Sequence, residues 1–337
     1  MRREHSTHRI NYRHPATSLA NYLTVRACYA CSTEFVAGYP SKIVFEPTSF
    51  CNLKCPLCPT GVGALHRADG YMSLEQFRSI VEEIKPYTTH IEFAGYGEPF
   101  MHADICEMVR YASSTGIFTN MHTNANLIDT PEKVHGLITS GLGHLTLSID
   151  GATQDVYEKY RVGGSLERVA SNVRALFEER NRLQATSPVV TVQTVVTKKN
   201  EHQVEDMRKL AEDLGADNFR AKAAHIVMGR PRKITGGLVD HWVSRDNRFN
   251  RFFKRRNKQQ LNGCDWLYKR ASIHWNGDIT TCCYDATSQN KMGNIFEAGS
   301  FWTIWNSPKY RALRRQVNED ITKAEPLCSV CPARTMI

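Results

Sequence analysis

The sequence "KIVFEPTSFCNLKCPLCPTG", residues 42–61, joins a short apolar, β-branched run to three closely spaced cysteines, Cys51, Cys55 and Cys58. The run predicts a strand, and the two prolines among the cysteines exclude a regular helix after it. The three thiols must therefore converge through a loop at the end of a strand. Three thiolates can hold three irons of a 4Fe–4S cubane and leave the fourth iron open to another ligand.

Zinc is the alternative metal for this loop. A structural zinc site needs a fourth protein ligand, and His66 is the only nearby candidate. Spacing favours the iron–sulfur cluster but leaves both metals open.

Downstream of the cysteines, short β-branched runs alternate with longer helical patterns. Helix-like periodicity begins after Ser73, a good N-cap with Gln76 three residues on. Six strand–helix units predict an α/β fold with a parallel sheet, either doubly wound or a partial barrel, with the chemistry at the carboxyl ends of the strands. The expected strands are 42–50, 90–95, 117–123, 144–150, 189–197 and 217–224, and the expected helices begin at Ser73 and span 103–115, 131–140, 165–183 and 201–214.

Composition sets the broad class of the protein. The chain has 337 residues, of which 41% are hydrophobic and 23% charged, as expected of a globular protein. We expect a cytoplasmic protein without a membrane span, because no apolar run reaches about 18 residues and no secretory signal is present. Eleven cysteines in such a chain indicate metal binding or catalysis rather than disulfides.

The net charge of +9 is concentrated between residues 229 and 260. We interpret 229–262 as a basic linker and consider nucleic-acid binding unlikely as its role. The basic residues there are Arg230, Arg232, Lys233, Arg245, Arg248, Arg251, Lys254, Arg255, Arg256 and Lys258.

The segment "CNLKCPLC" resembles the C-x3-C-x2-C motif of the radical S-adenosylmethionine (radical SAM) superfamily. "GYGEP", with Gly95, Gly97 and Glu98, looks like the family's Gly-Gly-Glu-Pro motif, although Tyr96 stands where many members have glycine. The resemblance implies a partial (β/α)6 TIM barrel over residues 42–228 and S-adenosylmethionine as cofactor. It also implies that the glycines approach the methionyl part of the cofactor and that Glu98 pairs with its ammonium group.

Residues at the next two expected strand ends extend the resemblance. Thr123 and Asn124 follow the third strand, and Ser148 and Asp150 end the fourth. By resemblance these four residues lie near the ribose and carboxylate of S-adenosylmethionine, and Arg161 pairs with the same carboxylate.

A second cysteine group lies near the C-terminus, where Gly277 and Asp278 predict a hairpin turn. It resembles the twitch domain, a shortened SPASM domain that carries one auxiliary 4Fe–4S cluster, and a zinc ribbon is the alternative. Residues 263–337 are then the auxiliary domain, and residues 1–41 a helical lead-in. The four expected ligands of the second cluster are Cys264, Cys282, Cys328 and Cys331.

The resemblance implies that a 5′-deoxyadenosyl radical removes a hydrogen atom from the substrate. We expect oxidation of an alcohol to a ketone on a sugar or aminocyclitol, in natural-product (antibiotic) biosynthesis, with flavodoxin or ferredoxin as the external reductase. The alternatives are radical epimerisation and modification of a ribosomal peptide; epimerisation needs a cysteine hydrogen donor, for which Cys283 is the first candidate and Cys28, Cys31 and Cys106 are others. A regulatory protein that senses redox state through its clusters and binds nucleic acid is a further alternative. Such a protein would have no use for the S-adenosylmethionine motifs at the strand ends. Substrate contacts are expected from Tyr96, Lys222 and His225.

Overall fold

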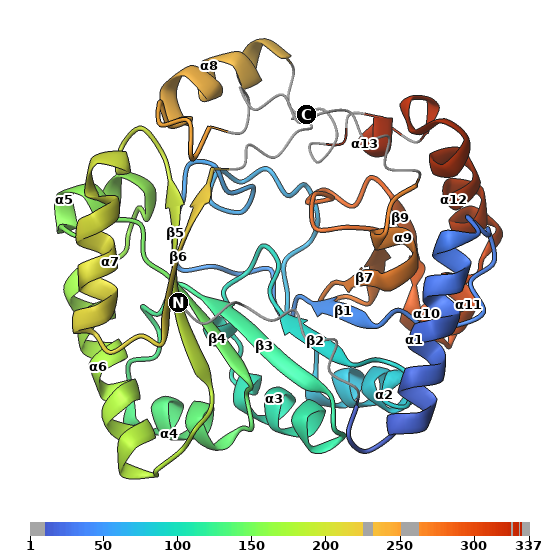
Figure 1. Ribbon diagram of the computed structural model, residues 1–337, viewed down its shortest axis with the longest axis horizontal. Coiled ribbons are helices and arrows are strands. Elements are labelled where there is room, and N and C mark those ends of the chain that lie inside the picture. The colour runs from blue at the N-terminus through green and yellow to red at the C-terminus, as the bar shows by residue number, and fades with distance from the viewer. Residues whose placement is uncertain (1–10, 225–231, 251–262, 325, 330, 332–337) are drawn as a thin grey trace.

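The computed structural model describes residues 11–224, 232–250, 263–324, 326–329 and 331. Its centre is one sheet of nine strands in the order β6-β5-β4-β3-β2-β1-β7-β8-β9. The first six strands are parallel and curve into a partial TIM barrel (Figure 1), which confirms the predicted α/β fold. They are β1 (Lys42–Phe45), β2 (His90–Phe93), β3 (Phe118–Thr123), β4 (His144–Ser148), β5 (Val189–Val196) and β6 (Asn218–Ala223).

Helices cover the outer face of this barrel (Figure 1). The predicted cap of the first one is present, because Ser73 and Gln76 form a reciprocal capping box. The covering helices are α2 (Leu74–Ile84), α3 (Ile105–Ser114), α4 (Pro131–Thr139), α5 (Gln154–Tyr160), α6 (Leu166–Arg182) and α7 (Val204–Asp213).

The two faces of the barrel strands differ in polarity. Along β2, Ile91 and Phe93 are buried in the core between the sheet and the helices, whereas His90 and Glu92 are only partly buried. The same alternation runs along β3, since successive side chains of a strand point to opposite faces. The concave face is therefore polar, and it leads towards the strand ends where the predicted site residues lie.

The C-terminal part continues the same sheet. Strand β7 (Arg270–Ile273) pairs in parallel with β1, and β8 (Asp278–Thr280) and β9 (Lys291–Asn294) follow in antiparallel order. Gly277, with φ of 84°, makes the tight turn before β8. The predicted barrel and the predicted auxiliary domain thus share one hydrogen-bonded sheet, which the sequence did not indicate.

Further helices lie outside the barrel units. In the predicted lead-in, α1 spans Pro15–Ala30, and in the predicted basic linker α8 spans Arg232–Trp242. Residues 225–231 and 251–262, which hold six of the ten basic residues of this run, lie outside the described residues. None of the described helices is long and apolar enough to cross a membrane. The C-terminal helices are α9 (Trp266–Lys269), α10 (Ile295–Ala298), α11 (Phe301–Trp305), α12 (Pro308–Asp320) and α13 (Pro326–Ser329).

Candidate functional site

The loop after β1 carries the three predicted cluster cysteines. Leu57, between the last two, is buried, and a Cβ on Gly61 would lie 2.3 Å from the carbonyl oxygen of Cys55. Only glycine therefore lets the chain fold back over the loop. Burial raises the pKa of Cys51 to about 12, and Cys55 and Cys58 lie close enough for their charges to act on it. Binding of iron has to displace the thiol protons.

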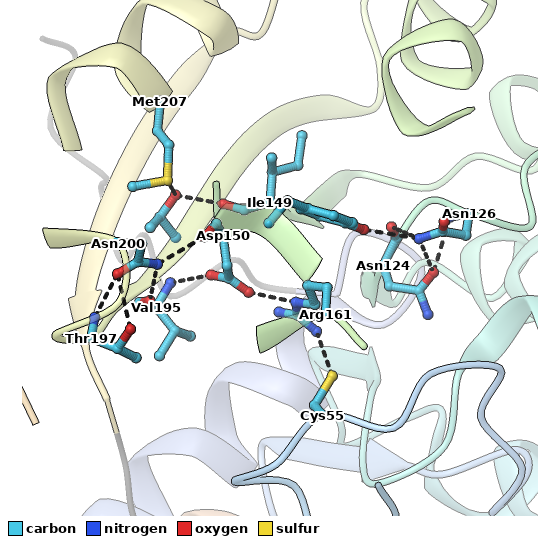
Figure 2. Close-up of polar contacts among 12 residues, drawn as sticks. Cys55, Asn124, Asn126, Ile149, Asp150, Arg161, Val195, Thr197, Asn200 and Met207 are labelled. Atoms are coloured by element: carbon cyan, nitrogen blue, oxygen red, sulfur yellow. Dashed lines mark hydrogen bonds and ion pairs between the residues drawn. The ribbon is translucent and has the colours of Figure 1, made fainter. Parts of the chain in front are cut away.

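Arg161 lies directly beside this loop (Figure 2). Its NH1 donates to the sulfur of Cys55 at 3.8 Å, and its Nε donates to Asp150 at 2.5 Å. Burial alone would lower the pKa of Arg161, but Asp150 and Cys55 raise it well above its usual value. Arg161 is thus a permanent cation next to the cysteines, where the resemblance expects a carboxylate to bind.

Asp150 acts on this region through Arg161. Its carboxylate is fully buried, and its second oxygen accepts a hydrogen bond from the backbone N–H of Val195 at 2.5 Å. Ser148, two residues earlier at the end of β4, is partly buried and pairs through its backbone with Gln193. The structure therefore brings Asp150 and Arg161 together and leaves Ser148 as a separate strand-end residue.

Asn124 connects the end of β3 to the cysteine loop. Its side-chain amide donates to Asn52, the residue after Cys51, at 2.8 Å. Its side-chain oxygen accepts hydrogen bonds from the backbone and side chain of Asn126, at 2.9 and 3.1 Å (Figure 2). Asn52 and Asn126 were not predicted from the sequence. The short polar run at the end of β3 was the signal that could have indicated them.

Glu98 holds the ends of β2 and β3 together. Its carboxylate accepts hydrogen bonds from the hydroxyl of Thr123 at 2.6 Å, the N–H of Asn124 at 2.8 Å and the N–H of Phe100 at 3.2 Å. It thereby caps the 3₁₀ helix Pro99–Met101, and burial raises its pKa. Both oxygens already have protein donors, so pairing with a cofactor ammonium stays a prediction.

The two glycines before Glu98 pack against the chain that follows β1. A Cβ on Gly97 would lie 1.9 Å from the carbonyl oxygen of Thr48, and Gly95 has a φ of 144°. Such close backbone approach is possible only for glycine. The motif stretch is therefore held against the start of the cysteine loop.

The second cysteine group gathers beyond β7. The charge of Cys282 interacts with those of Cys264 and Cys328, and Cys331 interacts with Cys264 and Cys328. Burial raises the pKa of Cys328 to about 12, and Asn290 donates to its sulfur at 3.5 Å. Among the described residues, no three Cys, His, Asp or Glu side chains are close enough to hold a single metal ion.

Two family models match the chain. The radical SAM superfamily model matches residues 45–211, and the SPASM iron–sulfur cluster-binding domain model matches residues 264–332. The chain belongs to the radical SAM superfamily. The second match confirms a C-terminal iron–sulfur domain of the SPASM type, whereas the number of clusters stays a prediction.

Curated relatives of this radical SAM chain have different activities. PqqA peptide cyclase from Bradyrhizobium diazoefficiens is 30% identical over 56% of this chain and 47% of its own length. AdoMet-dependent heme synthase from Methanosarcina barkeri is 29% identical over 52% of this chain and 48% of its length. Mycofactocin maturase MftC from Mycobacterium tuberculosis is 28% identical over 82% of this chain and 73% of its own length. The chain spans about half the length of the first two relatives.

Solved structures share the fold of this radical SAM chain. Streptococcus suis SuiB is 18% identical, with a TM-score of 0.64 over 89% of this chain and 73% of its own. BtrN in complex with AdoMet and 2-DOIA is 17% identical, with a TM-score of 0.50 over 83% of this chain and 88% of the BtrN chain. At these identities the likeness shows the fold alone.

Tyr96, the departure from the family motif, joins the two cysteine regions of the radical SAM chain. Its carbonyl oxygen accepts a hydrogen bond from Thr60 at 2.5 Å, two residues after Cys58. Its hydroxyl donates to the carbonyl oxygen of Cys283 at 2.5 Å, next to Cys282. Tyr96 therefore contacts the first cysteine loop through its backbone and the second through its side chain.

A buried ionic group under Tyr96 was missed by the sequence analysis. Glu46 lies between Arg67, at 2.6 Å, and His274, at 3.3 Å, and accepts the backbone N–H of Tyr96 at 2.9 Å. Burial would raise the pKa of Glu46, but His274 and Arg67 lower it to about 2. The sequence signal that could have indicated this group is a glutamate directly after the apolar run of β1.

The structure separates Cys283 from the other spare cysteines. Cys283 is exposed as a residue, but burial of its thiol raises the pKa of the thiol to about 11. Glu92 adds to this increase, whereas Arg270 and Lys42 oppose it, and all three come from concave-face strands. The other three lie away from this face: Cys28 packs against the core from α1, Cys31 follows α1, and Cys106 on α3 lies near α4. Of the predicted substrate contacts, Lys222 lies on β6, and His225 falls outside the described residues.

Proposed function

We propose that this radical SAM enzyme modifies a peptide by removing a hydrogen atom from one of its C–H bonds. The observation that carries the reaction class is the three-cysteine loop with Arg161 held beside Cys55. One of the relatives above, PqqA peptide cyclase, is named for a peptide, which supports a peptide substrate. Oxidation of a sugar or aminocyclitol, expected from the sequence, has less support because no curated relative above bears such a name.

The spacing of the cysteines is compatible with the metal groups that the family implies, because a 4Fe–4S cluster binds each thiolate at a separate iron and needs no three donors at one ion. Cys51, Cys55 and Cys58 would hold the first 4Fe–4S cluster through three thiolates, which leaves one iron for the cofactor. When bound, the cluster and S-adenosylmethionine supply the carbon-centred radical that removes the hydrogen atom. The ligands of the second cluster would be Cys264, Cys282, Cys328 and Cys331.

The remaining residues would bind and orient the cofactor. Arg161 is a fixed cation for its carboxylate, and Asp150 fixes the direction of the guanidinium. Gly95 and Gly97 let the backbone approach the methionyl part, and Glu98 holds that backbone against β3. An external flavodoxin or ferredoxin would deliver the electron.

Radical epimerisation is the second candidate, and the position of Cys283 near Glu92, Arg270 and Lys42 on the concave side favours it. In that reaction the thiol returns a hydrogen atom to the opposite face of the substrate carbon. Cys283→Ala should then stop turnover without stopping formation of 5′-deoxyadenosine. Product formed in deuterium oxide should carry one deuterium at an inverted carbon.

The peptide proposal is tested with the reconstituted enzyme, S-adenosylmethionine and dithionite under anaerobic conditions. Short peptides encoded beside its gene, and a panel of sugars and aminocyclitols, are offered separately. A change in peptide mass that requires Cys51, Cys55 and Cys58 supports the proposal. Conversion of a sugar or aminocyclitol to a ketone, with every peptide unchanged, would contradict it.

A further inference from the structure

One part of the concave face carries more positive than negative charge. Lys42 begins β1 and Arg270 begins β7, and the two residues are direct partners in the parallel pairing of these strands. Glu92 on β2 and His122 on β3 lie on the same face. We name Lys42, Glu92, His122 and Arg270 the concave cluster.

The single carboxylate of the concave cluster is already shared. Lys42 forms an ion pair with one oxygen of Glu92, and Nε2 of His122 lies 2.9 Å from the other. Burial would raise the pKa of Glu92, but His122 and Lys42 hold it well below its usual value. Glu92 is therefore ionised and has partners on both oxygens.

Arg270 has no such partner among the residues that the structure describes. Its guanidinium stacks on the ring of Trp266, 4.9 Å from the centroid, and makes no hydrogen bond or ion pair with the described side chains. The residue is partly exposed. Stacking fixes the plane of a guanidinium while its N–H groups stay available, which suits two-point binding of a carboxylate.

The neighbourhood of Arg270 connects it to the proposed chemistry. Cys283, an exposed residue, has its thiol near Arg270, Lys42 and Glu92. The backbone of Cys283 is held by Tyr96, which also contacts the first cysteine loop. A ligand anchored at Arg270 would therefore lie on the face of the sheet that the two cysteine groups border.

We propose that Arg270 binds a carboxylate of the substrate and makes the enzyme specific for a peptide that presents a carboxylate there. The carboxylate can belong to an Asp or Glu side chain or to the C-terminus of the peptide. This inference rests on the proposed peptide substrate and names its chemical class.

The test measures binding of three fluorescein-labelled peptides to the anaerobic holoenzyme with S-adenosylmethionine, by fluorescence anisotropy. The peptides are Gly-Glu-Tyr-Glu-Gly-amide, Gly-Gln-Tyr-Gln-Gly-amide and Gly-Gln-Tyr-Gln-Gly with a free C-terminus. At least one carboxylate-bearing peptide should bind about tenfold or more tightly than the uncharged amide, as expected for a charged hydrogen bond. Which of the two binds tightly identifies the source of the carboxylate.

Variants assign the preference to one side chain. Arg270→Gln should reduce the preference to within about threefold, and Arg270→Lys should keep part of it because a lysine binds without the planar fork. Arg174→Gln removes the same charge from an exposed position on α6 and should keep the full preference. Iron content and cleavage of S-adenosylmethionine without peptide show whether each variant is folded and loaded.

Three results would overturn the inference: equal binding of all three peptides, binding of none of them, or an equal effect of Arg270→Gln and Arg174→Gln. None of these depends on turnover. Modification of a C-terminally amidated peptide that lacks Asp and Glu would reject the preference for a carboxylate and leave the proposed function standing. Failure to modify any peptide would reject the proposed function instead.

Discussion

Gly97 lies at a close backbone contact of the site. A Cβ added to it would lie 1.9 Å from the carbonyl oxygen of Thr48. The contacted atom is a backbone carbonyl oxygen and cannot rotate away. Gly97→Ala should therefore lower the free energy of unfolding by at least about 2 kcal/mol and weaken S-adenosylmethionine binding. Urea unfolding and equilibrium binding measure the two effects.

Gly237→Ala is the matched control for this substitution. Gly237 lies in α8, and a Cβ there meets nothing within 4 Å. Alanine should leave cofactor binding unchanged and raise stability by up to about 1 kcal/mol, since glycine is a poor helix former. Equal effects of the two substitutions would show that the contact with Thr48 is not important.

Glu46 gives the fold a defined dependence on pH. Its pKa is lowered from 4.5 to about 2 by His274 and Arg67 against the effect of burial. A carboxylate with a lowered pKa stabilises the fold above its unfolded pKa and loses that contribution as the pH falls from about 4.5 towards 2. Glu46→Gln should lower the free energy of unfolding by on the order of 3 kcal/mol at pH 7 and by much less near pH 3.

The measurement compares urea unfolding of wild type and Glu46→Gln across this pH range. Both proteins carry the same cysteines, so the difference between them isolates the carboxylate. A difference that stays constant from pH 7 to pH 3 would show that Glu46 does not titrate as described.

Sequence motifs identified the cysteines and most strand-end residues, because chain order alone decides their spacing. The partners of those residues could not be predicted in the same way. Arg67 reaches Glu46 only after the loop beyond the cysteines folds back, and His274 reaches Glu46 only after β7 joins β1. Contacts between distant segments depend on the fold, which a single sequence does not reveal.

At the scale of elements, the six parallel strands were predicted because each is a short β-branched run between helical patterns. Helices α2, α3, α4, α6 and α7 were predicted from the spacing of their apolar residues. The short helix α5 and the helix α8 in the basic linker were missed. Helix α5 has only 7 residues, and α8 contains two adjacent glycines, which disfavour a helix.

Tyr96 is the element-scale connection between the two cysteine loops. Tyr96→Phe keeps the ring but leaves the carbonyl oxygen of Cys283 without its hydroxyl donor. We expect backbone amides of residues 281–285 to exchange several-fold faster, since losing one hydrogen bond costs about 1 kcal/mol. Hydrogen exchange followed by mass spectrometry measures this.

Strands β3 and β4 serve as the internal reference in that experiment, because they make no contact with the Tyr96 hydroxyl. Their exchange should stay unchanged, and so should the iron content. Faster exchange throughout the barrel would mean that the substitution loosens the whole fold rather than the second loop.

For the whole molecule, the two cysteine groups predict two separate clusters. Anaerobic reconstitution should give about eight irons per chain. Simultaneous replacement of Cys51, Cys55 and Cys58 by alanine should leave about four irons and abolish cleavage of S-adenosylmethionine. Zinc found in place of iron at the second group would contradict the auxiliary-cluster assignment.

The pairing of β7 with β1 also protects the barrel from self-association. Without β7, the backbone N–H and C=O groups of Lys42–Phe45 would form an open edge. Open edges recruit strands from other molecules and lead to aggregation. Strand β7 covers this edge, and in chain order it follows all six barrel strands. A nascent barrel would therefore be vulnerable until β7 emerges from the ribosome, so chaperone binding should matter most during that interval.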